Sequence, residues 1–325
     1  MDEMKKLPKV TIAMAVYKPN LDFFRQQLES INKQDYGNVS LLIWNDSSQD
    51  FQCEEIVSQY ITKIPYRILD NGHNNGVTQA FAHLTEAAEG KYIAYCDQDD
   101  IWLKNKISTT VAFMEDHPEC SCCHCECQLI DEHNDVVKNK IYPAALDIIN
   151  DITYQKKSFF VKAWGIGCAM LMPCNIAKAA LPFPNMVFHD QWLEMFALTS
   201  GKFYYIPDLL LKHRVHSTNN SQTLHGVKTK EDYYKLKLKK EEKLFSFLQS
   251  RLSYWQEYKK EEQWIKARIK FAEEPSLRTF FELLSWVYIR PGVTLFELIM
   301  PFIPDAIFIN VLKLIREEVR KFGIR

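Results

Sequence analysis

The first third of the chain alternates between short apolar runs and stretches of helical periodicity. The apolar runs have the length of buried strands, and they fall at residues 10–16, 39–44, 66–69 and 92–96. After the first run, apolar residues recur at helical spacing from Leu21 to Ile31, behind Asn20, a residue type that favours the N-cap. Repeated strand–helix–strand units predict an α/β fold, with a mostly parallel central sheet and helices on both faces.

The pattern changes twice along the rest of the chain. Residues 120–206 are mixed, with a glycine-containing apolar strand predicted at 164–172 and a helix beginning near His189. Residues 228–271 combine many Lys and Glu residues with apolar residues at helical spacing, which predicts one or two amphipathic helices. We therefore expect an α/β domain at residues 1–225 and a helical C-terminal region at residues 226–325.

Composition and charge narrow the class of protein. The 325 residues are 47% hydrophobic and 25% charged, as in ordinary globular proteins. The formal net charge of −1 gives no global field that would attract nucleic acid, so we expect no nucleic-acid partner. The charged first residues lack the apolar core of a signal peptide, which favours a cytoplasmic location with the nine cysteines as free thiols.

Polar clusters follow the predicted strands at the edge where α/β sheets bind their ligands. The sharpest cluster follows the fourth strand and consists of Asp97, Gln98, Asp99 and Asp100. Three carboxylates within four residues suit a hard divalent cation, Mg²⁺ or Mn²⁺, shared with the phosphates of a substrate. The alternative is a solvated acidic turn that begins the following helix.

Two later segments carry candidate chemistry. Asp190 follows His189 at the start of a predicted helix, where it is either a general base or an N-terminal helix residue beside a surface histidine. Arg214 and His216 precede Asn219 and Asn220, and this group suits either diphosphate and metal contacts or an ordinary polar loop.

Five cysteines crowd into residues 120–127. A zinc site usually needs two ligand pairs separated by a loop, and the chain has no second pair of this kind. We therefore expect these cysteines to be small buried core residues of a strand.

The C-terminal tail is rich in apolar pairs between residues 280 and 308, with Arg and Lys on either side. Charged residues and prolines interrupt residues 293–315, the most apolar stretch, so we expect no transmembrane helix there. The pattern predicts helices lying on a membrane surface, or else a tail that packs on the protein or forms a homodimer.

Together these motifs resemble the family 2 glycosyltransferases of the GT-A fold, over about residues 8–222. The resemblance rests on Asn74, Asn75, Gly76 and Val77, on Gly90 to Ile93, and on the Asp-Gln-Asp-Asp-Ile-Trp motif ending at Trp102. This motif is similar to that of a subgroup that includes many bacterial rhamnosyltransferases.

The resemblance implies a role for each matching residue. Asp46 would recognise the nucleotide base, and the backbone from Ala15 through Tyr17 would lie along the nucleoside. Asp97 and Asp99 match the DxD metal motif, with His216 as a further metal ligand. Asp190 matches the catalytic base. The other residues expected to bind the donor are Asn75, Gln98, Trp102, Gly167, His189, Arg214 and His216.

The implied activity is the inverting transfer of a sugar, such as rhamnose, from a nucleotide-diphosphate sugar to a saccharide or lipid-linked acceptor in bacterial cell-surface polysaccharide synthesis. The enzyme would act in the cytoplasm or peripherally on the inner face of the cell membrane. His213 departs from the family pattern, which has tyrosine there, and Glu126 stands where aspartate is frequent. The alternatives are a metal-dependent nucleotidyltransferase and a non-catalytic sugar-binding or scaffolding subunit.

Overall fold

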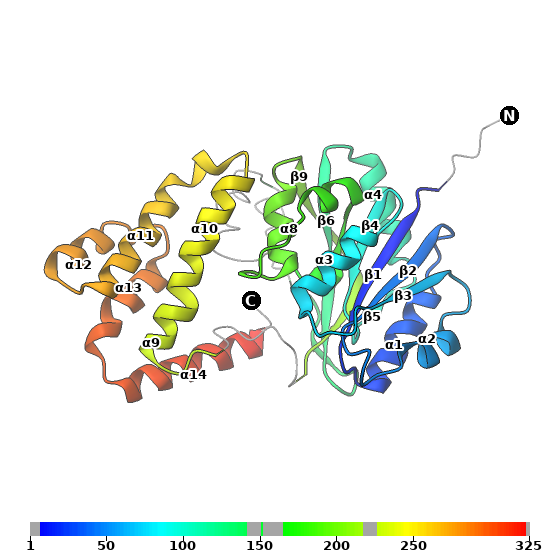
Figure 1. Cartoon of the computed structure of the whole chain (residues 1–325), viewed down its shortest axis with the longest axis horizontal. Coiled ribbons are helices and arrows are strands. Elements are labelled where there is room, and N and C mark those ends of the chain that lie inside the picture. Colours follow the sequence, from blue (N-terminus) through cyan, green and yellow to red (C-terminus); the bar gives the residue numbers. More distant parts are fainter. Residues whose placement is uncertain (1–6, 142–150, 152–164, 217–225, 323–325) are drawn as a thin grey trace. The chain divides into compact units, whose positions relative to one another are not determined.

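The computed structural model describes residues 7–141, 151, 165–216 and 226–322, with side chains up to residue 314. The chain divides into two compact units, Met1–Ser217 and Thr218–Arg325 (Figure 1). The boundary expected near residue 225 falls in the segment 217–225, outside the described residues, as do Asn219 and Asn220.

The first unit is built on a mixed nine-stranded sheet in which the strands predicted in the first third of the chain are parallel neighbours. Their order across the sheet is β3-β2-β1-β4. Buried side chains, mostly apolar, fill β1, β2 and β4, as the continuous apolar runs predicted, whereas β3 lies at the edge of the sheet and is only half-buried. The bounds are β1 Val10–Val16, β2 Val39–Asn45, β3 Tyr66–Leu69 and β4 Tyr92–Cys96.

The other half of the sheet mixes strand directions. Beside β4 lies antiparallel β8 (Met170–Pro173), followed by β6 (Cys120–Ile130), which is antiparallel to β8 and parallel to β9 (Lys202–Arg214). The short β5 (Ile101–Trp102) pairs with β9, and β7 (Val136–Lys138) pairs with β6. The strand predicted at 164–172 is shorter than expected, because Gly167–Ala169 forms a 3-10 turn, η1, before β8 begins.

Helices cover both faces of this sheet. Helices α1 (Leu21–Asn32) and α2 (Cys53–Tyr60) pack together, as right-handed crossovers toward β3 require. The chain then crosses back through α3 (Val77–Ala87), which contacts α7 (Cys174–Ala179) and α8 (His189–Ala197). Helix α4 (Lys106–Asp116) packs on β6 and β9. Asn20 caps α1 as predicted, since its side chain accepts hydrogen bonds from Asp22 N and Phe23 N.

The cysteines of residues 120–127 lie on β6, and all five are buried and unbridged. The expectation of small core residues is confirmed. The thiols of Cys120, Cys123, Cys125 and Cys127 pack with apolar side chains of β1, β4 and β9 in one core.

The second unit is helical throughout its described residues. Its core holds one buried guanidinium, that of Arg268, which donates to Glu297 Oε2 at 2.7 Å and Glu297 Oε1 at 2.6 Å. None of the described helices is both long and apolar enough to span a membrane. The elements are α9 Lys230–Tyr233, η2 Tyr234–Leu238, α10 Lys239–Arg251, η3 Trp255–Tyr258, α11 Lys259–Glu273, α12 Leu277–Leu284, α13 Pro291–Ile299, η4 Met300–Phe302 and α14 Asp305–Phe322.

Candidate active site

The acidic turn, residues 97–100, connects β4 to β5. Because β5 pairs antiparallel with the end of β9, Ile101 lies opposite Lys212. This pairing brings the turn against His213, Arg214 and His216, which follow directly in the sequence. Two segments more than a hundred residues apart thus meet at the carboxyl end of β4, where α/β sheets bind their ligands.

Asp99 and His216 form a close pair at this meeting point. Asp99 Oδ2 lies 2.8 Å from His216 Nε2, and the two side chains are only 18% and 11% exposed. The imidazole of His216 also contacts the Phe23 ring, with centroids 5.6 Å apart. Carboxylate oxygen and imidazole nitrogen both suit Mn²⁺, and the carboxylate also suits Mg²⁺, so this pair fits the metal ligands expected from the sequence.

Asp100, the last residue of the turn, is fully buried. Its Oδ1 lies 2.9 Å from His213 Nδ1 and accepts a hydrogen bond from Arg214 N at 2.9 Å. Burial by itself raises the pKa of Asp100. The charge and hydrogen bond of His213 act in the opposite direction, and the net shift of the Asp100 pKa is downward. The pKa of His213 rises correspondingly: burial lowers it, and Asp100 more than compensates. The two groups therefore favour the charged pair.

Arg214 is also buried, and it holds the acidic turn in place. Its Nε donates to Asp99 O at 2.8 Å. The remaining guanidinium nitrogens donate to Asp131 O at 3.0 Å, Asn134 Oδ1 at 2.8 Å and Gln26 Oε1 at 3.0 Å. Burial lowers the pKa of Arg214 despite the nearby carboxylates. These hydrogen bonds show that Arg214 stabilises the conformation of the turn. Contact of Arg214 with a donor stays a prediction.

Asp190 lies in the first turn of α8 and is 1% exposed. Its Oδ1 accepts from Gln191 N at 2.8 Å, and its Oδ2 accepts from Gly167 N at 3.3 Å. The next residue of η1, Cys168, places its Sγ 3.6 Å from His213 Nδ1. One three-residue turn therefore contacts both Asp190 and the cluster around Asp100.

Two residues expected to bind the donor lie in the interior. The His189 ring stacks on Phe81, with centroids 3.8 Å apart, and it is 5% exposed. Trp102 is 3% exposed, and Lys106 Nζ lies 3.8 Å from the centre of its ring. Both side chains are packed among other protein side chains, and direct contact of either with a donor stays a prediction.

The residues expected on the nucleoside side form a second group at the ends of β1 and β2. Tyr17 N donates to Gln98 Oε1 at 2.8 Å and Gln98 Nε2 donates back to Tyr17 O at 3.2 Å, so the acidic turn is tied to the loop that follows Ala15. The buried Asp46 accepts from the backbone nitrogens of Asn75 and Gly76, each at 2.8 Å. Gly76 has a φ of 77°, which favours glycine at this position.

A comparison with known families decides the class of protein. The sequence profile described as Glycosyl transferase family 2 matches residues 11–178, more than half of the chain. The chain belongs to glycosyl transferase family 2. This glycosyltransferase is 27% identical over 240 residues to an uncharacterized glycosyltransferase of Methanocaldococcus jannaschii, covering 72% of this chain and 80% of that protein. It is also 27% identical over 166 residues, 51% of this chain and 60% of the relative, to a UDP-Glc:alpha-D-GlcNAc-diphosphoundecaprenol beta-1,3-glucosyltransferase of Escherichia coli.

Solved structures show that the fold of this glycosyltransferase is the GT-A fold expected from the sequence. Residues 1–349 of S. aureus TarS, in complex with UDP-GlcNAc, superpose with a TM-score of 0.57 at 14% identity, over 89% of this chain and 81% of that one. The mannosyltransferase PcManGT from Pyrobaculum calidifontis, in complex with GDP-Man and Mn²⁺, gives a TM-score of 0.54 at 12% identity, over 98% of this chain and 88% of that one.

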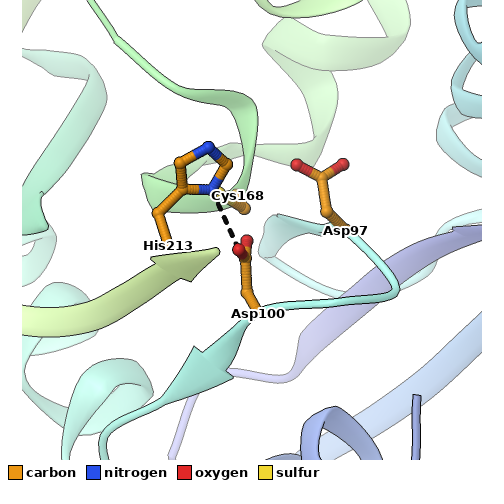
Figure 2. Close-up of side chains that lie close together, drawn as sticks. All are labelled: Asp97, Asp100, Cys168 and His213. Carbon is orange, nitrogen blue, oxygen red and sulfur yellow. Dashed lines mark hydrogen bonds and ion pairs between the residues drawn. The ribbon is translucent and has the colours of Figure 1, made fainter. Parts of the chain in front are cut away.

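Four side chains of this glycosyltransferase converge at the acidic turn: Asp97, Asp100, Cys168 and His213 (Figure 2). Cys168 and His213 were not among the site residues expected from the sequence. Asp100 was visible as the fourth residue of the acidic motif, and His213 as a departure from the family pattern. The neighbouring Gly167 was expected to bind the donor, but no pattern marks the Cys168 thiol itself, because the η1 turn and the pairing of β5 with β9 bring it to the acidic turn.

The close fit around Gly167 gives a test of the turn. A Cβ at residue 167 would lie 2.8 Å from His189 Nε2 and 3.3 Å from Asp190 Cβ. We therefore expect Gly167→Ala to displace the Asp190 carboxylate, lowering sugar transfer and reducing stability by about 1–3 kcal/mol. Enzyme assays and thermal unfolding measure the two effects. Gly37→Ala is the control, because its Cβ would meet only Leu7 Cδ1 at 3.8 Å. Equal activity of both variants would contradict the proposed tight contact.

Proposed function

We propose that this enzyme is an inverting, metal-dependent glycosyltransferase that moves a sugar from a nucleoside-diphosphate sugar to a hydroxyl of a saccharide or lipid-linked acceptor. The observation that carries the proposal is the η1 turn, which contacts Asp190 through Gly167 N and contacts His213, beside Asp97 and Asp100, through Cys168 Sγ. A general base close to a set of cation ligands is what single displacement at a sugar diphosphate requires. The similarity to bacterial rhamnosyltransferases extends the proposal to rhamnose as the sugar and to surface polysaccharide synthesis as the setting.

The metal proposal rests on the chemistry of the ligands. Asp97, Asp99 and His216 would hold Mg²⁺ or Mn²⁺, which when bound neutralises the charge that develops on the departing diphosphate. Arg214 and Gln98 fix the turn in advance, Arg214 through Asp99 O and Gln98 through the backbone of Tyr17. Such preorganisation avoids rearrangement during the reaction. PcManGT, which shares this fold, was solved with GDP-Man and Mn²⁺.

Asp190 is the proposed base, and backbone donors orient it. Gln191 N and Gly167 N each donate to one of its carboxylate oxygens, so the side chain is held in a fixed rotamer. In the proposed step Asp190 takes the proton of the acceptor hydroxyl while the oxygen of that hydroxyl bonds to the anomeric carbon and the carbon–diphosphate bond breaks. The diphosphate departs as an anion, so no paired acid is needed, in contrast to a glycosidase. Attack from the opposite side inverts the anomeric configuration.

Replacing the base tests this step. We expect Asp190→Asn to lower transfer by about 100-fold or more, because proton transfer by a positioned base contributes about 10²–10⁴-fold. Donor binding should persist, and it is measured by the thermal shift that UDP-glucose, UDP-GlcNAc, GDP-mannose or dTDP-rhamnose produces with Mn²⁺ present. Asp208→Asn makes the same chemical change at an exposed residue and should leave transfer unchanged.

Two outcomes would count against the proposal. Near-normal sugar transfer by the Asp190→Asn variant would show that Asp190 is not the base. A wild-type enzyme that no nucleotide sugar stabilises and that hydrolyses none of them would favour a non-catalytic scaffolding subunit.

We also propose that the C-terminal unit contacts the membrane surface that carries a lipid-linked acceptor. Several large apolar side chains of this unit face solvent: Leu277 is 80% exposed, Phe281 is 63% exposed and Phe302 is 72% exposed. Leu277 and Phe281 are spaced i, i+4 on α12 and share one face, next to the exposed Arg278. Exposed aromatic and aliphatic residues beside basic residues suit an anionic lipid surface.

Flotation with anionic vesicles tests the membrane contact. We expect the full chain to float with the vesicles, and Leu277→Ser combined with Phe281→Ser to reduce the bound fraction, because the apolar face of α12 is lost. The matched control combines Val136→Ser with Val137→Ser, which removes two side chains that are 51% and 55% exposed on the first unit. A wild-type protein that stays in the soluble fraction would refute membrane contact, and light scattering would then show whether this face forms a homodimer.

A further inference from the structure

We propose that Asp100, Cys168 and His213, together with Asp97, form a second metal site that binds a thiolate-accepting ion, preferentially Zn²⁺. One ligand atom from each of these four residues lies within 4.8 Å of the others (Figure 2). They come from four places in the chain: the end of β4, the start of β5, the η1 turn and the end of β9. This site is distinct from the proposed Asp99–His216 pair, and its existence does not depend on the proposed function.

The distances suit a four-coordinate ion after small movements. Cys168 Sγ lies 3.6 Å from His213 Nδ1, and His213 Nδ1 lies 2.9 Å from Asp100 Oδ1. In a tetrahedral zinc site, bonds of about 2.0–2.3 Å place neighbouring ligand atoms roughly 3.3–3.8 Å apart. The sulfur–nitrogen distance already falls in this range. The nitrogen–oxygen distance needs to open by roughly a few tenths of an ångström, so that bonds to the ion replace the hydrogen bond, and binding releases the His213 Nδ1 proton and the Cys168 thiol proton to solvent.

A buried oxygen without a hydrogen bond points to an ion at this position. Asp100 is fully buried, and its Oδ2 makes no hydrogen bond of standard geometry to any described residue, whereas Oδ1 has two partners. The Cys168 thiol also interacts with this carboxylate, and an ion would replace the thiol proton there. An unsatisfied buried carboxylate oxygen costs about 1–3 kcal/mol or more, so native proteins rarely leave one. Figure 2 shows the Asp100 carboxylate directed toward Cys168 and His213, the side on which the ion would lie.

The ligand types distinguish this site from the one proposed for the diphosphate. Thiolate sulfur and imidazole nitrogen together favour Zn²⁺ or Co²⁺ over Mg²⁺, which prefers oxygen ligands. Cys168 and His213 supply the soft ligands, and the family pattern has tyrosine in place of His213. Asp97 belongs to both ligand sets, so an ion in one site draws this carboxylate away from the other.

The experiment uses the full chain, freed of metal by a chelator and titrated with Co²⁺. We expect one equivalent of Co²⁺ to produce the thiolate-to-cobalt charge-transfer absorption, and Zn²⁺ to displace it. Cys168→Ala should abolish the absorption, and His213→Tyr should weaken Co²⁺ binding by roughly 100-fold. Cys53→Ala and Cys122→Ala remove other buried thiols and should retain it. Asp99→Asn should also retain it, because Asp99 belongs only to the proposed Mg²⁺ or Mn²⁺ site.

Thermal unfolding without metal establishes that each variant is folded. His213→Tyr restores the residue usual in the family, so it keeps the test decisive if Cys168→Ala is unstable. A folded wild-type chain that gives no charge-transfer absorption with excess Co²⁺ would overturn the proposal, as would an absorption that survives Cys168→Ala. Neither result bears on sugar transfer in Mn²⁺, so failure here is distinguishable from failure of the proposed function.

Discussion

The arrangement of the site depends on the contact between the acidic turn at residues 97–100 and the end of β9. Three carboxylates lie within four residues, and their mutual repulsion would disperse them without opposing charge. His213 pairs with Asp100, His216 pairs with Asp99, and Arg214 holds the backbone of the turn. Pairing of β5 with β9 brings these groups together. The turn is thereby fixed before any ligand binds.

Hydrogen bonds connect the acidic turn to the other predicted site residues on both sides. Gln98 hydrogen-bonds the acidic turn to Tyr17, which follows β1. Asp46, which follows β2, hydrogen-bonds to Asn75 and Gly76 in the loop before α3. On the other side, Cys168 and Gly167 link the turn to Asp190. With the proposed base on one side and the proposed oxygen ligands on the other, the acidic turn is where we expect a sugar diphosphate to be held.

The parallel half of the sheet could be predicted from the sequence alone, because strands buried on both faces need continuous apolar runs such as that of β1. It was less informative for the mixed half. The two-residue β5 is too short to show a pattern, and the apolar stretch before β8 hides the η1 turn. The acidic turn and Asp190 were recognisable as candidates, whereas the buried settings of Arg214, His189 and Trp102 depend on tertiary contacts that no local pattern records. The cysteines of β6 attracted attention by their spacing, yet the thiol beside the carboxylates is Cys168, which has no such signal.

The most direct test of the account is to locate Mn²⁺ by anomalous X-ray scattering in crystals grown with Mn²⁺ and a nucleoside diphosphate. We expect an anomalous peak bonded to Asp99 and to the diphosphate, with the Asp190 carboxylate facing the terminal phosphate. An ordered nucleotide bound elsewhere, or bound at the sheet edge with no Mn²⁺ touching the acidic turn, would contradict it.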